Sequence, residues 1–331
     1  MNDNYTNVPV FLIFFNRPDT FKKVFNVVKE ARPKQLFLVC DGARTGREDD
    51  EKNISACKRI AEQVDWDCEV HKRYSDINLG CGMNMYSGIK WAFEYVDRLM
   101  ILEDDCVPSM DFFPFCEELL EKYKDDQRIS MISAMNHLEV YKEPHSDYFF
   151  SGGCCWGWAT WKRVWDDMDY TMDFLKDGYA MKCVEHLYPY YSNAIAIGQK
   201  KSDILKSGGK LSAWTYQAGI SAALNNQISI IPTVNLVTNI GLTADSEHAT
   251  NDIKKLPKKT QAYFNMPTHK LKFPLKHPKY VIEDRMYYHA VQKKFKISHV
   301  DHFEGIVRQL IFAEKGDIKK ILGKVKKKLH I

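Results

Sequence analysis

The sequence predicts an α/β fold with a mainly parallel central sheet flanked by helices, and three observations support this. Strand and helix patterns alternate through the first 135 residues of the 331-residue chain. The expected strands 8–15, 35–40 and 98–102 are largely apolar runs, as strands covered on both faces require. Polar or charged residues follow these strands, and in this architecture they should meet at one edge of the sheet.

The expected elements follow one another in a regular order. A strand over 8–15 precedes a helix that begins at Pro18, where proline suits the first turn. Apolar residues of this helix recur at helical spacing at Phe21, Val24 and Val28. The elements expected after it are a strand over 35–40, a helix through Ile54 and Ile60, a short strand near 68–71, a helix over 82–96, a strand over 98–102, a helix over 111–123 and a strand over 129–134. This βαβ rhythm predicts parallel pairing with helices on both faces.

Composition excludes several classes of protein. Hydrophobic residues make up 45% of the chain, enough for a sizeable core, and no apolar run approaches the roughly 20 residues of a membrane helix. Six of the lysines behind the net charge of +4 lie in 318–331, so nucleic-acid binding by the folded body is not favoured. The nine cysteines form no CxxC pair, and the N-terminus does not resemble a signal peptide. We therefore expect a cytoplasmic protein with reduced thiols.

Three consecutive acids, Glu103, Asp104 and Asp105, end the apolar run 99–102. A carboxylate cluster at the tip of a buried strand is costly unless a cation or a polar ligand lies there. Adjacent carboxylates are oxygen ligands for Mg²⁺ or Mn²⁺, and these ions commonly hold phosphates. The alternative is an acidic loop after a strand, or a cap for the helix that follows.

Other strand ends point to the same edge of the sheet. Asn16 and Arg17 follow the first strand, and Asp41 follows the second. No phosphate-binding Gly-Lys-Ser or Gly-Lys-Thr follows any strand. Residues 80–82 begin like a dinucleotide fingerprint, but Met85 occupies the place of the third glycine, so a dehydrogenase is not favoured.

Four segments of the chain resemble one enzyme family. They are Phe-Phe-Asn-Arg-Pro at 14–18, Asp41, Leu-Glu-Asp-Asp-Cys-Val-Pro at 102–108 with Asp-Phe-Phe at 111–113, and the glycine- and tryptophan-rich 151–161. Over 8–250 the sequence is similar to GT-A glycosyltransferases that use nucleotide-sugars, in particular the N-acetylglucosaminyltransferase I type and its bacterial surface-glycan relatives. The resemblance implies a Rossmann-like GT-A catalytic domain over 1–250, with a nucleotide half at 8–135 and an acceptor half at 136–250.

The resemblance also implies roles for individual residues. It implies that Asp105 binds Mn²⁺ or Mg²⁺, while Asp104 and Glu103 orient the ribose and the sugar. It implies that the nucleotide-sugar is contacted by Phe15, Asn16, Arg17, Asp41, Gly152, Gly153 and Trp156. Alternatives are a surface arginine at a helix start for Arg17 and a tight turn for the two glycines. Trp156, Trp158, Trp161 and Trp165 could each stack on a sugar; the alternative is core packing, which we expect for at least half of them.

The resemblance also implies a loop that closes over the nucleotide and a position for the catalytic base. Segments 235–241 and 245–250 resemble the loop that closes over the nucleotide, which makes His248 a second metal or phosphate contact unless it is merely solvated. Where bacterial relatives read Trp-Asp-Tyr-Gln, residues 214–217 carry Thr215, and threonine cannot act as a base at neutral pH. Asp203 and Glu247 are the nearest substitutes. Alternatively, the base lies at a position out of register with the family motif, or the activity is altered or absent.

The C-terminal part is expected to be an extension of the catalytic body. Residues 251–280 are rich in lysine and proline and predict an extended linker. Residues 281–331 predict helices at 281–294 and 302–313 and a basic amphipathic tail at 318–331. Such a tail can lie on the anionic inner face of a membrane. It can equally dock on its own domain or fray.

The function expected from these features is a metal-dependent, inverting transfer of a sugar. The donor would be a nucleotide-sugar, with UDP implied by the resemblance, and the acceptor a hydroxyl of a bacterial glycan or a lipid-linked glycan. The alternatives are a catalytically silent sugar-nucleotide-binding protein and a nucleotidyltransferase. A nucleotidyltransferase would show a glycine-rich, basic segment after the first strand, which residues 16–18 do not.

Overall fold

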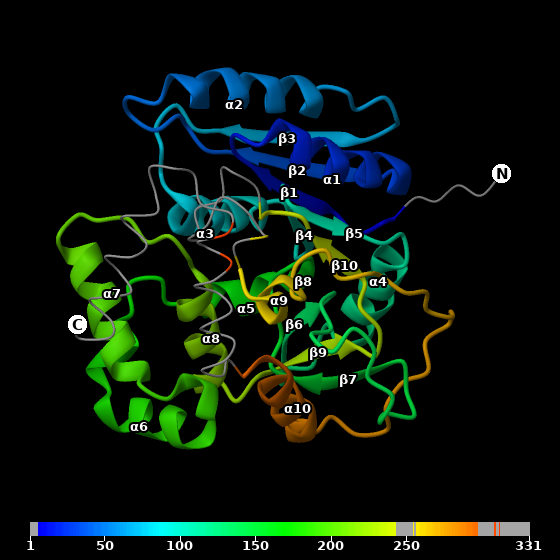
Figure 1. Cartoon of the computed structure of the whole chain (residues 1–331), viewed down its shortest axis with the longest axis vertical. Coiled ribbons are helices and arrows are strands. Elements are labelled where there is room, and N and C mark those ends of the chain that lie inside the picture. Colours follow the sequence, from blue (N-terminus) through cyan, green and yellow to red (C-terminus); the bar gives the residue numbers. More distant parts are fainter. Residues whose placement is uncertain (1–5, 243–253, 255, 297–307, 309–310, 312–331) are drawn as a thin grey trace.

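The computed structural model describes residues 6–242, 254, 256–296, 308 and 311. Its centre is an eight-stranded sheet in the order β3-β2-β1-β4-β8-β6-β9-β7 (Figure 1). The first four strands along the chain are mutually parallel: β1 (Val10–Phe14), β2 (Gln35–Cys40), β3 (Glu69–Tyr74) and β4 (Arg98–Glu103). The predicted α/β class, with a mainly parallel sheet and flanking helices, is confirmed.

Helices cover both faces of this parallel half. They are α1 (Pro18–Ala31), α2 (Glu48–Ala61), α3 (Cys81–Ala92) and α4 (Phe112–Lys122). Alternate residues of a strand point to opposite faces, so Leu12 packs in the core shared with α1, α2 and α4. Its neighbour Phe11 packs in a second core with α3. Burial on both faces explains why all five residues of β1 are buried, as its apolar run predicted.

The second half of the sheet departs from a simple parallel continuation. Its strands are β6 (Ile129–Ser133), β7 (Tyr148–Ser151), β8 (Trp158–Trp161) and β9 (Ile228–Pro232). The predicted strand near 129–134 is present, but β8 from the tryptophan-rich segment lies between it and β4, antiparallel to both. A separate antiparallel pair joins β5 (Cys106–Pro108) to β10 (Val237–Asn239). The sheet is therefore mixed on this side.

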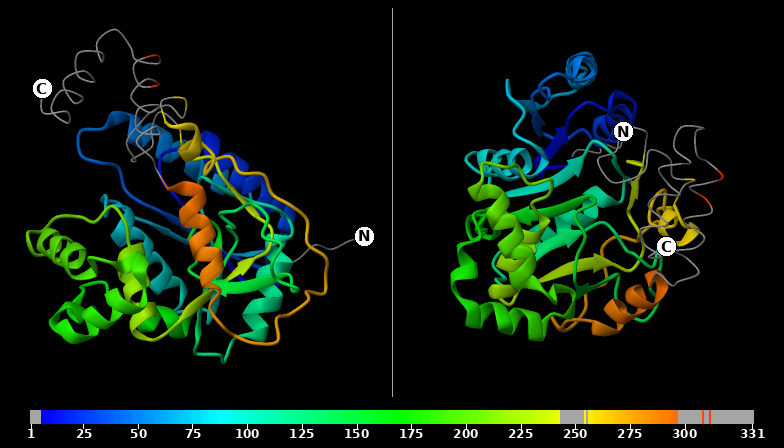
Figure 2. Two further views of the ribbon diagram at one scale, coloured as in Figure 1. Left: turned by 60° about the horizontal axis from the view of Figure 1, so that its bottom comes forward. Right: turned by 60° about the vertical axis from the view of Figure 1, so that its left-hand side comes forward.

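A helical layer lies beside this second half. It comprises α5 (Lys162–Asp166), η1 (Asp173–Lys176), α6 (Gly178–Leu187), η2 (Pro189–Tyr191), α7 (Ala194–Lys206) and α8 (Thr215–Leu224). In Figure 2 these green segments lie together on one side of the sheet, away from the blue helices α1 and α2. Trp158, Trp161 and Trp165 are buried, which confirms that at least half of the four neighbouring tryptophans are core residues.

Some predicted boundaries differ from the observed ones. The third strand runs to Tyr74 rather than His71, and the helix expected over 82–96 ends at Ala92. In the C-terminal part, α9 (Lys258–Gln261) interrupts the stretch expected to be extended, and α10 (Arg285–Phe295) matches the helix expected over 281–294. The expected helix over 302–313 and the tail 318–331 lie outside the described residues, apart from Arg308 and Ile311. In the part of the chain that the structure describes, no helix has the length and apolar character to cross a membrane.

Candidate nucleotide-sugar site

A cavity of about 270 Å³ opens at the carboxyl ends of β1 and β4. The strand order reverses at this point, since β2 and β3 lie on one side of β1 and β4 lies on the other. Open α/β sheets bind ligands in the crevice formed at such a reversal. Residues predicted for the site that do line this cavity are Phe15, Asn16, Arg17, Asp41, Glu103, Asp104, Asp105 and Trp156.

The acidic triplet is paired with Arg17. The Arg17 guanidinium forms an ion pair with Asp104, and its Nη1 lies 3.0 Å from Oδ2 of Asp105. The backbone N–H of Phe15 also donates to Asp104 at 3.1 Å. Asp104 is buried and Arg17 is one-fifth exposed, so this cluster lies in an environment where an unpaired charge would be costly.

The charges of the cluster do not fully balance. Burial raises the pKa of Glu103, and the neighbouring charges of Asp105 and Asp104 raise it further. Burial also raises the pKa of Asp104, although the charge of Arg17 opposes this. Burial alone would lower the pKa of Arg17, but the two aspartates outweigh it and raise that pKa. One guanidinium facing three carboxyl groups leaves a site that favours further positive charge.

Asp105 is held by the end of β10 and the residues that follow it. Its Oδ1 lies 3.4 Å from the amide nitrogen of Asn239, and its backbone carbonyl accepts from the N–H of Ile240 at 2.9 Å. A Cβ at Gly241 would come within 2.0 Å of Oδ2 of Asp105, so only glycine fits there with this carboxylate in place. The pairing of β5 with β10 thus brings a segment more than 130 residues away against the acidic triplet.

Asn16, Asp50 and Arg44 form a hydrogen-bonded group, here called the bracket, that fixes the turn after β1. Its amide donates to Asp50 at 2.6 Å, and Asp50 also accepts from the backbone and the guanidinium of Arg44. The Arg44 hydrogen bonds lower the pKa of Asp50 to about 2, against the effect of burial. The Arg44 guanidinium lies over the Phe15 ring at 5.4 Å from its centroid. The bracket therefore ties the end of β1 to the start of α2.

Asp41 anchors a neighbouring loop. Its two carboxylate oxygens accept from the backbone N–H groups of Gly42, Leu79 and Gly80 and from the side-chain amide of Asn78. Burial raises its pKa, and the backbone donors oppose that rise. In the structure these four donors bind its carboxylate, so Asp41 shapes the cavity by positioning residues 78–80. Its contact with a nucleotide-sugar, which the resemblance implies, stays a prediction.

Other predicted residues lie elsewhere. Gly152 and Gly153 do not line this cavity; they line a second, larger one. Thr215, the first residue of α8, also lines the second cavity. Asp203 lies on α7 and accepts a hydrogen bond from Gln199 at 2.7 Å. It lines neither of these cavities but a third one, of about 620 Å³, along α7. Glu247 and His248 lie outside the described residues.

The donor set is compatible with a divalent cation that binds phosphate. Among the residues that the structure describes, no three His, Cys, Asp or Glu side chains are arranged to hold a metal by themselves. Mg²⁺ commonly takes only one or two carboxylates from the protein and completes its shell with phosphate oxygens and water. Asp105, whose carboxylate retains 15% exposure in the cavity, is the residue suited to that role.

Sequence reasoning missed several residues of the cavity. Arg44, Asn78, Asn84, Ser212 and Phe264 line it as well. Arg44 and Asn78 lie in loops after the second and third strands, so a search of every strand end would have found them. Ser212 and Phe264 carry no local signal, because tertiary packing alone brings them to this edge.

Comparisons with known proteins give only distant likenesses. No protein-family model and no curated protein matches the chain. One similar solved structure is a UDP-glucose pyrophosphorylase complexed with UDP-glucose (11% identity, 48% of this chain and 78% of that chain, TM-score 0.27). Another is the inositol-1-phosphate CTP transferase from T. maritima (9% identity, 78% and 95%, TM-score 0.38). A third is the 4-diphosphocytidyl-2C-methyl-D-erythritol synthase from Anaerococcus prevotii (14% identity, 49% and 74%, TM-score 0.28). Likenesses this distant do not assign a function.

Proposed function

We propose that the protein is a glycosyltransferase that moves a sugar from a nucleotide-sugar to a hydroxyl group of a glycan or lipid-linked glycan acceptor. The observation that carries this proposal is the convergence of Asn16 and Arg17 with the acidic triplet in one cavity at the reversal of strand order. UDP is the nucleotide that the sequence resemblance implies. The proposal assigns the donor to this cavity.

The charged groups suit a diphosphate leaving group. In the transfer, the acceptor hydroxyl attacks the anomeric carbon, the bond from that carbon to the phosphate oxygen breaks, and charge accumulates on the diphosphate. Arg17 is a planar donor that can bind phosphate oxygens through two N–H groups. A divalent ion on Asp105, Mn²⁺ or Mg²⁺, would supply Lewis-acid stabilisation of the same charge.

The aromatic and amide groups suit the rest of the donor. Phe15 lies at the end of β1 with Arg44 over its ring, and Trp156 and Phe264 pack at 5.3 Å between ring centroids on another wall. Flat aromatic walls of this kind can hold a nucleobase or the apolar face of a sugar. We assign base and ribose recognition to the Phe15 and Asn78 side of the cavity, and sugar recognition to the Trp156 side.

The base that accepts the acceptor's proton is not assigned. Asp203 lines neither cavity, and Thr215 has no basic group at neutral pH. Glu247 keeps its place as a prediction from the sequence.

Isothermal calorimetry with UDP, with and without Mn²⁺, tests the proposal. We expect binding that strengthens with the metal, and we expect Asp105→Asn to remove most of the metal-dependent gain while thermal unfolding stays cooperative. The matched control is Asp125→Asn, which removes one carboxylate from an exposed site away from the cavity and should bind like the native protein. An absence of metal-dependent UDP binding would reject the donor site.

A screen of nucleotide-sugars then separates the rival functions. A glycosyltransferase should release UDP from a preferred nucleotide-sugar, slowly with water and faster with an acceptor glycan. A nucleotidyltransferase should instead form pyrophosphate from a nucleoside triphosphate and a sugar phosphate. Binding without turnover of either kind would favour a silent sugar-nucleotide-binding protein.

A further inference from the structure

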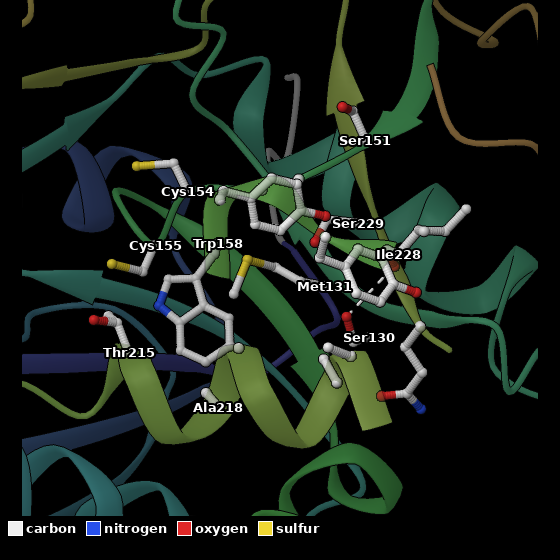
Figure 3. A pocket seen from close by; sticks show the side chains of 18 of the residues that line it. Ser130, Met131, Ser151, Cys154, Cys155, Trp158, Thr215, Ala218, Ile228 and Ser229 are labelled. Carbon is white, nitrogen blue, oxygen red and sulfur yellow. Dashed lines mark hydrogen bonds between the residues drawn. The ribbon is translucent and has the colours of Figure 1, made fainter. Parts of the chain in front are cut away.

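A second cavity, of about 520 Å³, lies between the sheet and helix α8. Figure 3 shows Ser130, Met131 and Ser229 on its strand side and Thr215 and Ala218 on the helix below. This cavity has no role in the donor binding proposed above. It is almost twice the size of the donor cavity.

The two cavities are neighbours that share walls. Three separate segments contribute to both: Cys155 lines the larger cavity and Trp156 the donor cavity, and Tyr263 and Phe264 divide in the same way. In the third segment, Ser212 lines the donor cavity while Trp214 lines the larger one. The larger cavity is therefore the neighbour of the donor cavity, with these segments between them.

The lining of the larger cavity is aromatic and uncharged for the most part. Trp158 stacks on Trp214 at 5.1 Å between ring centroids, and Tyr190 packs against Tyr288 at the same centroid distance. None of the described residues that line it is lysine or arginine, and Asp167 is the one carboxylate among them. His137 contributes an imidazole, but no lysine or arginine lies there to pair with an anionic ligand.

One polar atom of this cavity lacks a partner. The indole Nε1 of Trp158 makes no hydrogen bond, and the residue as a whole is buried, with 2% of its surface exposed. In Figure 3 this nitrogen points to the side on which Cys155 and Thr215 are drawn. A buried N–H without an acceptor is costly, so a ligand that accepts a hydrogen bond would relieve that cost.

We propose that the larger cavity binds the acceptor of the transfer and that the acceptor sugar held there is a neutral pyranose. This inference rests on the proposed function. A pyranose has apolar faces that pack on aromatic rings and hydroxyl groups that accept from Trp158 and bind the hydroxyl and amide groups of the wall. The segments that line both cavities make this one the neighbour of the donor cavity, and the lack of lysine and arginine in its lining disfavours uronic acids and phosphorylated sugars.

Two native thiols report on occupancy. Cys154 and Cys155 are half-buried, line the cavity and are adjacent in the chain (Figure 3). Cys68 has similar exposure but lines neither cavity, so it is an internal control within the same protein. Rates of iodoacetamide labelling, followed by peptide mass spectrometry, can be measured for all three without any mutation.

The test compares the methyl glycosides of glucose, galactose, mannose and N-acetylglucosamine with those of glucuronic and galacturonic acid. At about ten times its Kd, a neutral glycoside should slow labelling of Cys154 and Cys155 about tenfold, because only the unoccupied fraction reacts, and should leave Cys68 unchanged. Equal protection by the acidic glycosides overturns the inference. So does an absence of protection by every neutral glycoside.

A variant separates this inference from the donor site. Ala218→Leu adds three carbons to the cavity wall on α8 and should weaken neutral glycoside protection at least tenfold while leaving metal-dependent UDP binding unchanged. The matched control is Ala196→Leu, on an exposed face of α7. Unaltered glycoside protection in Ala218→Leu would contradict the assignment. Calorimetry with UDP reports separately on the proposed function, so the two failures are distinguishable.

Discussion

The donor cavity and its larger neighbour differ in polarity. The smaller one gathers Arg17 and three carboxyl groups, and most of these polar atoms already have partners within the protein. The larger one gathers aromatic rings and small polar groups, and there the indole N–H of Trp158 lacks a partner. A buried charged group needs its counter-charge within the protein even when no ligand is bound. An uncharged cavity can tolerate a single hydrogen-bond donor without a partner.

The largest expected effect comes from removing the counter-charge of the smaller cavity. Arg17→Ala leaves buried Asp104 without its ion-pair partner and should lower the free energy of unfolding by about 3 kcal/mol or more. Urea unfolding at pH 7 measures it. Arg128→Ala is the control, since Arg128 is 61% exposed in its pair with Asp126 and should cost about 1 kcal/mol or less. Equal losses of unfolding free energy in the two variants would mean that the ion pair of Arg17 contributes no more to stability than a surface ion pair.

The bracket beside the smaller cavity should respond to pH. Arg44 holds the pKa of Asp50 at about 2, below the ordinary value of about 3.9. A carboxyl group with a lowered pKa in the folded state stabilises the fold at a pH above its ordinary pKa. This contribution is lost as the pH falls through about 2. Asp50→Asn should therefore cost about 2 kcal/mol at pH 6, and the gap to the native protein should shrink between pH 4 and pH 2. Urea titrations at several pH values measure the gap. A gap that does not change with pH would contradict this account of the bracket.

Two glycine substitutions should disturb one cavity each. A Cβ at Gly241 would meet Asp105 at 2.0 Å, and a Cβ at Gly153 would meet Ser229 at 2.7 Å. Overpacking of this kind costs about 1–3 kcal/mol. Gly241→Ala should weaken UDP binding about tenfold, which corresponds to about 1.4 kcal/mol of binding free energy. It should not change the protection of Cys154 and Cys155 by glycosides. Gly153→Ala should show the reverse pattern. If either variant weakened UDP binding and glycoside protection equally, the two cavities would not be separate sites.

The smallest effect concerns the unpartnered donor. Trp158→Phe removes an N–H that makes no hydrogen bond, so it should change stability little and weaken neutral glycoside binding by about 1 kcal/mol. Trp161→Phe is the matched control, because its Nε1 donates to the carbonyl of Leu120 at 3.0 Å. That variant strands a buried carbonyl and should lose more stability without affecting the glycoside. Thermal unfolding and thiol protection measure the two effects.

The strand ends illustrate how far local reasoning reaches. Asn16, Arg17 and the acidic triplet were predicted to meet because parallel strands of one sheet end at one edge, and they line one cavity. The same reasoning brought Asp41 to this cavity, which it does line, but did not foresee that four donors from the chain at 42 and 78–80 bind its carboxylate. Sequence pattern locates a side chain at the edge without telling which partners the loops will bring to it.

The tryptophan-rich segment shows what a local sequence pattern does not encode. Its resemblance to a family motif suggested that Gly152, Gly153 and Trp156 would contact one ligand together. The chain crosses between two cavities within this segment, so the glycines line the larger cavity and Trp156 lines the smaller. The crossing lies between the end of β7 at Ser151 and the start of β8 at Trp158, the strand inserted between β4 and β6. No periodicity within 151–161 encodes it.

The sequence by itself determined the α/β class, the parallel half of the sheet and the position of the acidic cluster at a strand end. These follow from apolar runs and from residues adjacent in the chain, which are local properties. The tertiary structure alone decided that β10 brings Asn239 and Gly241 to Asp105, and that Tyr263 and Phe264 divide between two cavities. Those contacts join residues more than 100 positions apart, and their free energy arises from packing that exists only in the folded chain.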